Sequence, residues 1–169
     1  MAEESKCVKA KVGAIMVKDG RIISSGVNGS PSGHINCCDI YNQKDSCDIN
    51  HPEYDIHKQW SAENEIHAEV NALTKAGALD ELQDKFYIFV NKMPCKQCQK
   101  MLALYRPIAV YYHDEIDTID QDSILNKVGI ANINVATLEN KTKRKIDCDE
   151  INGAFAHLVL DHNLKYFTK

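Results

Sequence analysis

The sequence predicts a single α/β domain of three layers, in which helices cover both faces of a mixed five-stranded sheet. Two apolar runs flank the turn signal Asp19-Gly20, a pattern typical of an antiparallel hairpin. Beyond residue 64, helical and strand patterns alternate, which favours parallel strands joined through helices. A length of 169 residues and an apolar fraction of 44% suit one domain with its own core.

The first third of the chain is expected to form the hairpin and a long connection. Residues 11–17 and 21–27 are strand-like apolar runs on either side of the turn. Glycine and proline punctuate residues 28–33, so this stretch is predicted to be a loop. Residues 34–60 are polar, rich in aspartate and irregular in pattern. A structureless loop of that length is uncommon in a compact domain unless something holds it in place.

The later elements follow from periodicity and from residues that end helices. Ile66, Val70 and Leu73 recur at helical spacing and predict a helix over residues 65–77. The elements expected next are a strand at 86–90, a helix at 95–104, a strand at 108–112, a short helix at 122–128 and a strand at 133–138. The domain is expected to span residues 1–140. Residues 141–169 are expected to form a tail whose helix, around 150–160, packs on the same domain.

Composition narrows the classes of partner and compartment. The net charge of −4 and the pI near 6.0 argue against a broad nucleic-acid-binding face, but not against one anionic small molecule in a pocket. No apolar run approaches the ~18 residues of a membrane span, and the N-terminus lacks the apolar core of a signal peptide. We therefore expect a cytoplasmic protein without a membrane partner. Its seven cysteines cannot all pair within the chain, which favours metal binding.

Two short motifs carry the chemistry, His67-Ala68-Glu69 and Pro94-Cys95-Lys96-Gln97-Cys98. Cys95 and Cys98 stand three apart at a helix start, so both sulfurs lie on one face near a terminus that favours thiolates. His67 supplies a third ligand, and three protein ligands leave a zinc position for water, as in catalytic zinc sites. Glu69 is expected to move a proton from that water to the substrate. The alternative is that the two cysteines form half of a closed structural site.

With these motifs the chain resembles the cytidine-deaminase-like family and, within it, the deoxycytidylate (dCMP) deaminases of T-even-type phages. Besides the zinc motif, the stretches that carry the resemblance are Glu4-Ser5-Lys6-Cys7, Val12-Gly13-Ala14 with Arg21-Ile22-Ile23-Ser24, Asn28-Gly29-Ser30-Pro31-Ser32-Gly33 with Asn36-Cys37-Cys38-Asp39, and Trp60-Ser61 with Asn64-Glu65-Ile66-His67-Ala68-Glu69. They cover roughly residues 4–140. The zinc motif specifies the superfamily, whereas residues 28–33 together with residues 36–39 point to the dCMP branch.

The resemblance implies a cytidine-deaminase-like fold and zinc-dependent hydrolysis of dCMP to dUMP and ammonia, which supplies thymidylate synthesis. It implies a homo-oligomer, usually a hexamer, activated by dCTP and inhibited by dTTP, and located in the host cytoplasm if the chain is phage-encoded. Asn28 matches the asparagine that contacts the substrate sugar, and Ser30 lies in the same loop. Tyr112 ends a strand on the side where α/β sheets bind ligands. The alternatives are a plain turn at Asn28-Gly29 and core packing of Tyr112.

A second, non-catalytic zinc is also implied by the resemblance. Its ligands fall on Cys7, Cys37, His57 and Glu65. A closed four-ligand zinc would pin residues 34–60, which lack a core of their own. The alternative is that Cys37 and Cys38 are small buried side chains and that His57 lies on the surface. Other possible ligands are Cys47, His34 and His51. Cys148 is expected to remain an unliganded thiol.

Some positions depart from the family pattern or are left open by it. Met93 stands where relatives usually have Ser or Thr, at the border of the base pocket, which leaves open cytosine, a 5-modified cytosine or lost activity; the alternative is that Met93 simply packs in the core. A catalytically inactive nucleotide-binding or assembly module is the alternative from another class, and intact Glu69 argues against it. A tRNA adenosine deaminase would need a basic surface, which this acidic chain lacks. Candidate phosphate partners are Lys11, Lys92 and Arg106, although a solvated surface position is the expected alternative for each of them.

Overall fold

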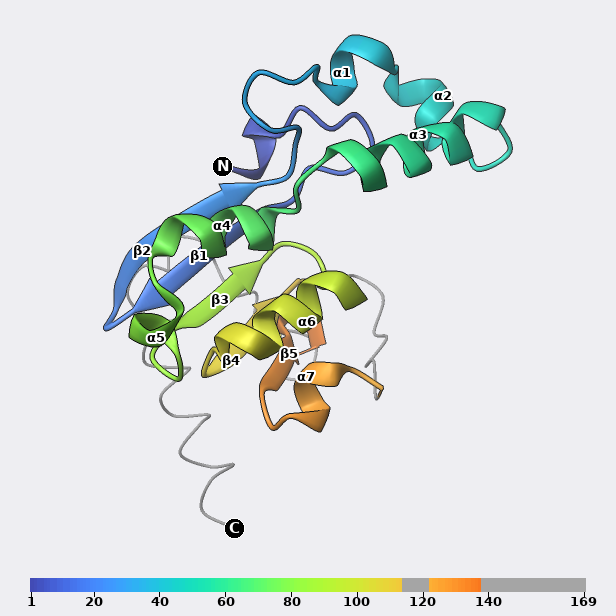
Figure 1. Cartoon of the computed structure of the whole chain (residues 1–169). Helices are drawn as coiled ribbons and strands as arrows, with labels where there is room; N and C mark the ends of the chain where they lie inside the picture. Colours follow the sequence, from blue (N-terminus) through green and yellow to red (C-terminus); the bar gives the residue numbers. More distant parts are fainter. Residues whose placement is uncertain (114–121, 138–169) are drawn as a thin grey trace.

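The computed structural model describes residues 1–113 and 122–137, and a mixed five-stranded sheet organises them (Figure 1). The strands are β1 (Gly13–Lys18), β2 (Arg21–Val27), β3 (Tyr87–Val90), β4 (Ala109–Tyr112) and β5 (Ala131–Asn134), in the order β2-β1-β3-β4-β5. β1 runs antiparallel to both β2 and β3, whereas β3, β4 and β5 are parallel. The predicted mixed sheet is confirmed.

The opening hairpin is also confirmed, and its turn explains why Asp-Gly stands there. Asp19 and Gly20 have φ values of 52° and 71°, the left-handed conformation that a two-residue hairpin turn requires at both central positions. Glycine adopts this conformation without steric cost, and aspartate tolerates it better than most residues. The turn therefore fixes the pairing of β1 with β2.

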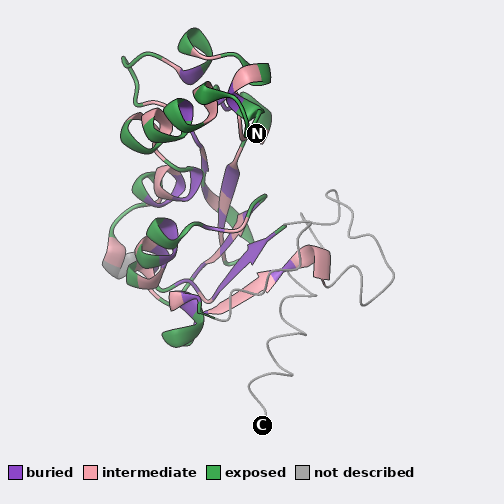
Figure 2. Ribbon diagram, turned by 90° about the vertical axis from the view of Figure 1, so that its right-hand side faces the viewer, coloured by how far each residue is buried: buried purple, intermediate pink, exposed green. Residues whose placement is uncertain are grey.

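Helices α4 (Ala68–Ala76), α6 (Lys96–Tyr105) and α7 (Ile124–Lys127) lie on one face of the sheet (Figures 1 and 2). A short helix, α5 (Leu79–Leu82), leads from α4 to β3. The main core lies between these helices and the strands; its largest members include Met16, Leu73, Phe86, Ile88 and Leu102. A smaller apolar cluster around Tyr111 occupies the other face. The expected tail helix around residues 150–160 lies outside the described residues.

Helix α4 begins at Ala68, three residues later than predicted. Ile66 is held instead in an isolated β-bridge with Gly29, through hydrogen bonds of 2.9 and 3.1 Å between their backbones. His67 is the extended N-cap residue of α4. Glu65 and His67 consequently stand in an extended segment, because the bridge outweighs the helical pattern of the apolar side chains.

The last strand also differs from its predicted bounds. It begins at Ala131 because its register with β4 pairs Ala109 with Ala131 and Tyr112 with Asn134. It ends at Asn134, whose side-chain oxygen accepts a hydrogen bond of 3.1 Å from the backbone N–H of Ala136 and turns the chain. The strand was expected at 133–138, since sequence alone does not reveal the partner that sets this register.

The prediction of an irregular loop at residues 34–60 is wrong. The segment folds into α1 (Cys37–Ile40), α2 (Gln43–Cys47) and α3 (Pro52–Asn64), which form a lobe beyond the ends of β2 and β3 (Figure 1). Polar residues start these helices: Asn36 and Asp39 form a capping box, and the Asn42 side chain accepts from the Asp45 N–H. The apolar pattern is weak because the residue α3 buries is His57. A 3₁₀ turn, Ala2–Glu4, precedes β1.

Helix α4 is pressed closely against β2, and this contact positions the helix start. A Cβ atom added at Gly26 would lie 2.3 Å from the Ala68 carbonyl oxygen and 2.5 Å from the Ala72 nitrogen. Two side chains reinforce the approach: Ser24 donates to the Ala72 carbonyl at 2.7 Å, and Asn71 donates to the Val27 carbonyl at 2.8 Å. Only glycine fits at position 26.

We expect Gly26→Ala to destabilise the protein by about 3 kcal/mol, because the added methyl meets backbone that cannot give way without moving α4. Urea denaturation of the zinc-loaded protein measures this change. Ser25→Ala is the matched control, since Ser25 is exposed on the same strand and should shift stability by under ~0.5 kcal/mol. Equal midpoints for the two variants would contradict the tight approach of α4 to β2.

Among the described residues, no helix is both long and apolar enough to cross a membrane.

Candidate metal centres and active site

The first cluster of metal-binding side chains joins the two helix starts predicted to carry the chemistry. The ligand atoms of His67, Cys95 and Cys98 all lie within 4.8 Å of one another. The His67 Nδ1 atom is 3.4 Å from the Cys95 sulfur and 3.3 Å from the Cys98 sulfur. Tetrahedral zinc with ordinary Zn–S and Zn–N bonds would set these atoms about 3.5 Å apart. The donor atoms are therefore already placed to hold one zinc ion.

Local backbone structure explains this placement. His67 and Cys95 are the extended N-cap residues of α4 and α6, and Cys98 lies in the first turn of α6. Buried Gln99 donates from its amide to the Pro94 carbonyl at 2.9 Å and accepts from the buried Ser123 hydroxyl at 3.0 Å. This pair of hydrogen bonds holds the turn before Cys95, so that both sulfurs face His67.

The electrostatics of the cluster favour a thiolate. Hydrogen bonds from Cys98 and His67 lower the pKa of Cys95 to about 3. The hydrogen bond with Cys95 and burial together raise the pKa of Cys98, as expected when two neighbouring sulfurs hold one proton between them. The hydrogen bond to Cys95 also raises the pKa of His67. A dication that replaces the shared protons would satisfy all three side chains at once.

Glu69 lies beside this cluster in the first turn of α4. Glu69 is only 3% exposed, and burial raises the pKa of its carboxyl group. The carboxyl group is in hydrogen-bonding contact with Cys98. A buried carboxyl group with a raised pKa exchanges protons more readily near neutral pH, which suits a proton shuttle.

A second cluster lies where the lobe meets the start of β1. The ligand atoms of Cys7, Cys37 and His57 also lie within 4.8 Å of one another, and all three residues are buried. His57 Nε2 is 3.0 Å from the Cys37 sulfur. Burial raises the pKa of Cys7, raises that of Cys37 to about 12 and lowers that of His57. Burial thus favours the neutral forms of these three side chains, so that neither thiol ionises readily on its own.

Glu65 supplies the fourth donor that a closed site needs. Its carboxyl group contacts Cys7, and one of its oxygens accepts a short hydrogen bond from Ser61. Its other oxygen, Oε1, is buried without a hydrogen-bond partner among the described residues. A buried, unpaired carboxylate oxygen is costly unless it is ligated, so this donor set fits a bound zinc.

Both clusters open onto one cavity of about 720 Å³ between the lobe and the end of the sheet. Its wall includes His67 and Cys95 from the first cluster and Cys7 and His57 from the second, together with the two neighbouring carboxyl groups of Glu69 and Glu65. A concave site with convergent polar groups and perturbed pKa values is the form that active sites usually take. The first cluster thus has donor side chains on three sides, and its remaining side is open to a small molecule in the cavity.

Comparison with known proteins identifies this constellation. The family described as the cytidine and deoxycytidylate deaminase zinc-binding region matches residues 1–114, more than half of the chain. The chain belongs to this deaminase family. Its sheet and helices form the cytidine-deaminase-like fold, and the donor atoms of its first cluster fit the zinc that this family binds.

Individual relatives support the same family. The chain is 33% identical over 180 residues to the deoxycytidylate deaminase of Enterobacteria phage T4, covering 90% of this chain and 91% of that protein. It is also similar to the dCMP deaminase of cyanophage S-TIM5 in complex with dCMP and dUMP, with 33% identity and a TM-score of 0.56 over 79% of this chain and 87% of that one. The apo form of that enzyme gives a TM-score of 0.53 at 34% identity, covering 78% of this chain and 85% of that one.

Of the three residues expected to contact the substrate, Asn28, Ser30 and Tyr112, the first alone lines the described cavity. Asn28 lines the cavity, but its side chain also anchors the segment that carries Cys7. Its Oδ1 accepts from the Ser5 hydroxyl at 2.7 Å and the Val12 N–H at 2.9 Å, and its Nδ2 donates to the Ala10 carbonyl at 2.9 Å. Among the described residues, the other amide N–H of Asn28 has no acceptor and can meet a ligand.

Ser30 and Tyr112 do not line the cavity as the described residues define it. Tyr112 is 3% exposed within β4, and the Ser30 hydroxyl is buried without a partner among those residues. Their contact with a substrate stays a prediction. Met93 does line the cavity, next to Cys95.

Sequence analysis did not predict the part of the cavity wall that comes from α3 and from the segment before β1. Lys9, Tyr54 and Lys58 all line it. The only signal available was proximity, because Lys9 follows Cys7 by two residues and Lys58 follows His57 directly. Nothing in the sequence shows that these two segments meet, so the fold is needed to bring Lys9 and Lys58 to one wall.

Proposed function

We propose that this protein is a zinc-dependent dCMP deaminase that hydrolyses dCMP to dUMP and ammonia. The observation that carries the proposal is the placement of His67, Cys95 and Cys98 around one point, with the buried Glu69 carboxyl group on the same cavity. The relatives named deoxycytidylate deaminase, and the solved phage enzyme that holds dCMP and dUMP, support the choice of substrate.

The proposed roles follow from positions on the cavity wall. His67, Cys95 and Cys98 would hold the zinc ion, which would supply an activated water with a pKa of about 7. Glu69 moves two protons in turn: it passes the first from the attacking water to the ring nitrogen, and then passes the proton of the added hydroxyl group to the amino group, which leaves as ammonia. Asn28 offers its remaining N–H to the sugar. Cys7, Cys37, His57 and Glu65 are the proposed ligands of a second zinc, which holds the lobe.

The proposal also covers the oligomeric state, the effectors and the cellular location of the enzyme. The resemblance to phage dCMP deaminases supports a homo-oligomer, a hexamer in its usual form, with dCTP and dTTP as effectors. It also supports a cytoplasmic enzyme that acts on free nucleotides rather than nucleic acid. The catalytic unit is proposed to span residues 1–140.

Ammonia release from zinc-loaded protein tests the proposal. The substrates to compare are dCMP, 5-methyl-dCMP, 5-hydroxymethyl-dCMP, dCTP, deoxycytidine and dAMP, each with and without added dCTP. We expect dCMP to be turned over fastest and dCTP to raise the rate. Faster turnover of a 5-modified nucleotide would assign base selection to Met93, which lines the cavity. No ammonia from any of these substrates would contradict the proposed function.

A further inference from the structure

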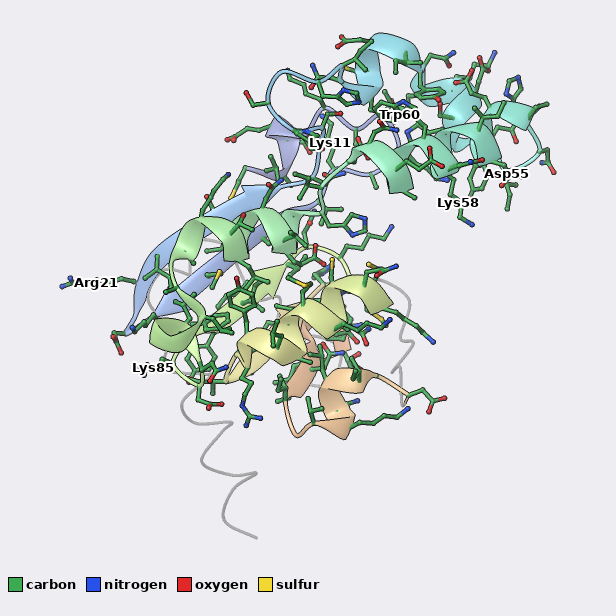
Figure 3. All side chains as sticks on the ribbon, in the orientation of Figure 1. Lys11, Arg21, Asp55, Lys58, Trp60 and Lys85 are labelled. Carbon is green, nitrogen blue, oxygen red and sulfur yellow. The ribbon has the colours of Figure 1, made fainter. Side chains whose placement is uncertain are left out.

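Three lysines gather on the wall of the shared cavity, from three separate parts of the chain. Lys9 lies on the segment between Cys7 and β1, Lys58 on α3, and Lys92 on the turn between β3 and α6. Lys58 extends from α3 on the side facing α4 and α6, whereas Trp60 points back toward α1 (Figure 3). The lobe and the sheet therefore each bring positive charge to one space.

Lys9 is the most firmly placed of the three. Its Nζ atom lies 3.2 Å from the centre of the Tyr54 ring, a cation–π contact across the cavity wall. Both residues are partly buried, so the ammonium group is partly removed from water. The aromatic face holds the charge without neutralising it, which leaves the N–H donors of Lys9 for an anion.

The other basic candidates from the sequence are used elsewhere. Lys11 pairs with Glu3 at 2.7 Å, and Arg106 pairs with Asp84 at 3.2 Å. By contrast, no carboxylate in residues 1–113 or 122–137 forms an ion pair with Lys9, Lys58 or Lys92. Unpaired cations in a cavity favour a ligand that brings negative charge of its own.

We propose that Lys9, held by Tyr54, forms with Lys58 and Lys92 the subsite for the 5′-phosphate of the nucleotide substrate. This inference rests on the proposed function and assigns the part of that site which recognises the phosphate. A phosphate monoester carries a charge of about −2 at neutral pH and takes hydrogen bonds on three oxygens. Three lysines from different directions match such a group, and a nucleoside without phosphate gains nothing from them.

Lysine-to-methionine substitutions test the assignment, because methionine keeps the apolar stem and removes the charge. We expect Lys9→Met to raise the KM for dCMP by about 10- to 100-fold with little change in kcat, the usual loss for a charged hydrogen bond. Smaller increases are expected for Lys58→Met and Lys92→Met, whose side chains are exposed. Turnover of deoxycytidine should not change in any of them. Lys9→Arg should restore most of the affinity for dCMP.

A matched control comes from the opposite end of the molecule. Lys85 is exposed before β3, whereas Lys92 follows that strand, and Figure 3 shows Lys85 far from Lys58. Lys85→Met should leave the kinetics of both substrates unchanged. The assignment is overturned if the lysine variants keep the KM of the parent enzyme for dCMP, or if deoxycytidine turnover falls as much as dCMP turnover.

Equilibrium binding separates this inference from the proposed function. Calorimetry with dUMP and with deoxyuridine, on zinc-loaded protein, needs no turnover. If the protein deaminates nothing but binds dUMP more tightly than deoxyuridine, and Lys9→Met removes the difference, the subsite stands and the proposed reaction fails. Equal affinity for dUMP and deoxyuridine in the parent protein would overturn the subsite, whatever the enzyme turns over.

Discussion

Glu69→Gln is expected to lower the kcat for dCMP by about 10²- to 10⁴-fold while leaving the fold and the zinc content intact. The carboxyl group is buried on the cavity wall beside the Cys98 thiol, where it can reach both water and substrate. Glutamine has the same shape but cannot accept and return a proton. Because Glu69 belongs to none of the proposed ligand sets, its loss should not release metal.

Three measurements on the same preparation make this test sharp. Ammonia release gives kcat, elemental analysis gives zinc per chain, and thermal unfolding gives the midpoint temperature. Glu63→Gln is the matched control, since Glu63 is exposed on α3 and pairs only with Gln59 at 3.0 Å among the described residues. A Glu69→Gln enzyme that retains full activity would refute the assignment of the proton shuttle. A variant that loses zinc would instead show that the carboxyl group is a ligand.

Cys37→Ala has the second large expected effect, on the metal content and on the lobe. We expect the parent protein to bind two zinc ions per chain and the variant to bind one. The Cys37 sulfur lies 3.0 Å from His57 Nε2, and the lobe buries little else that could hold its helices. Structural zinc sites contribute about 10–16 kcal/mol of binding free energy in small zinc-dependent peptides, so its loss should loosen residues 34–64.

Elemental analysis and hydrogen exchange of the lobe helices check this expectation. Cys38→Ala is the matched control, because Cys38 is the next residue, is exposed, and lies outside the cluster. Cys38→Ala should keep both ions and the exchange protection of α3. A parent protein with one zinc per chain would contradict the second site, and so would unchanged zinc content in Cys37→Ala.

The sequence predicted well what depends on local chemistry. Asp19-Gly20 specifies a hairpin turn by its conformational preference, and the Cys95–Cys98 spacing specifies one face of a helix start. It predicted poorly what depends on a distant partner. The bridge between Gly29 and Ile66 delays the start of α4, and only the fold reveals that these residues pair.

The lobe shows the same division within one segment. Its ligand positions were predicted from the resemblance, and the structure brings Cys7, Cys37 and His57 together. Its helices were missed, because caps and metal-binding side chains replace the apolar stripe that usually identifies a helix. The contact of Lys9 with Tyr54 joins residues 45 positions apart and leaves no trace in either local pattern.

The extended segment between α3 and α4 has a thermodynamic consequence. Glu65 and His67 are two residues apart, so their side chains leave the same side of the chain, and both line the cavity while the Ile66 backbone is fixed by Gly29. An ion bound through Glu65 would restrict the backbone that orients His67, and the reverse holds equally. If both positions bind zinc, the conformational entropy lost on filling either one is partly lost for both, and the two zinc affinities would then be linked with positive cooperativity. Metal supply to the lobe would thereby set how readily the catalytic position is filled.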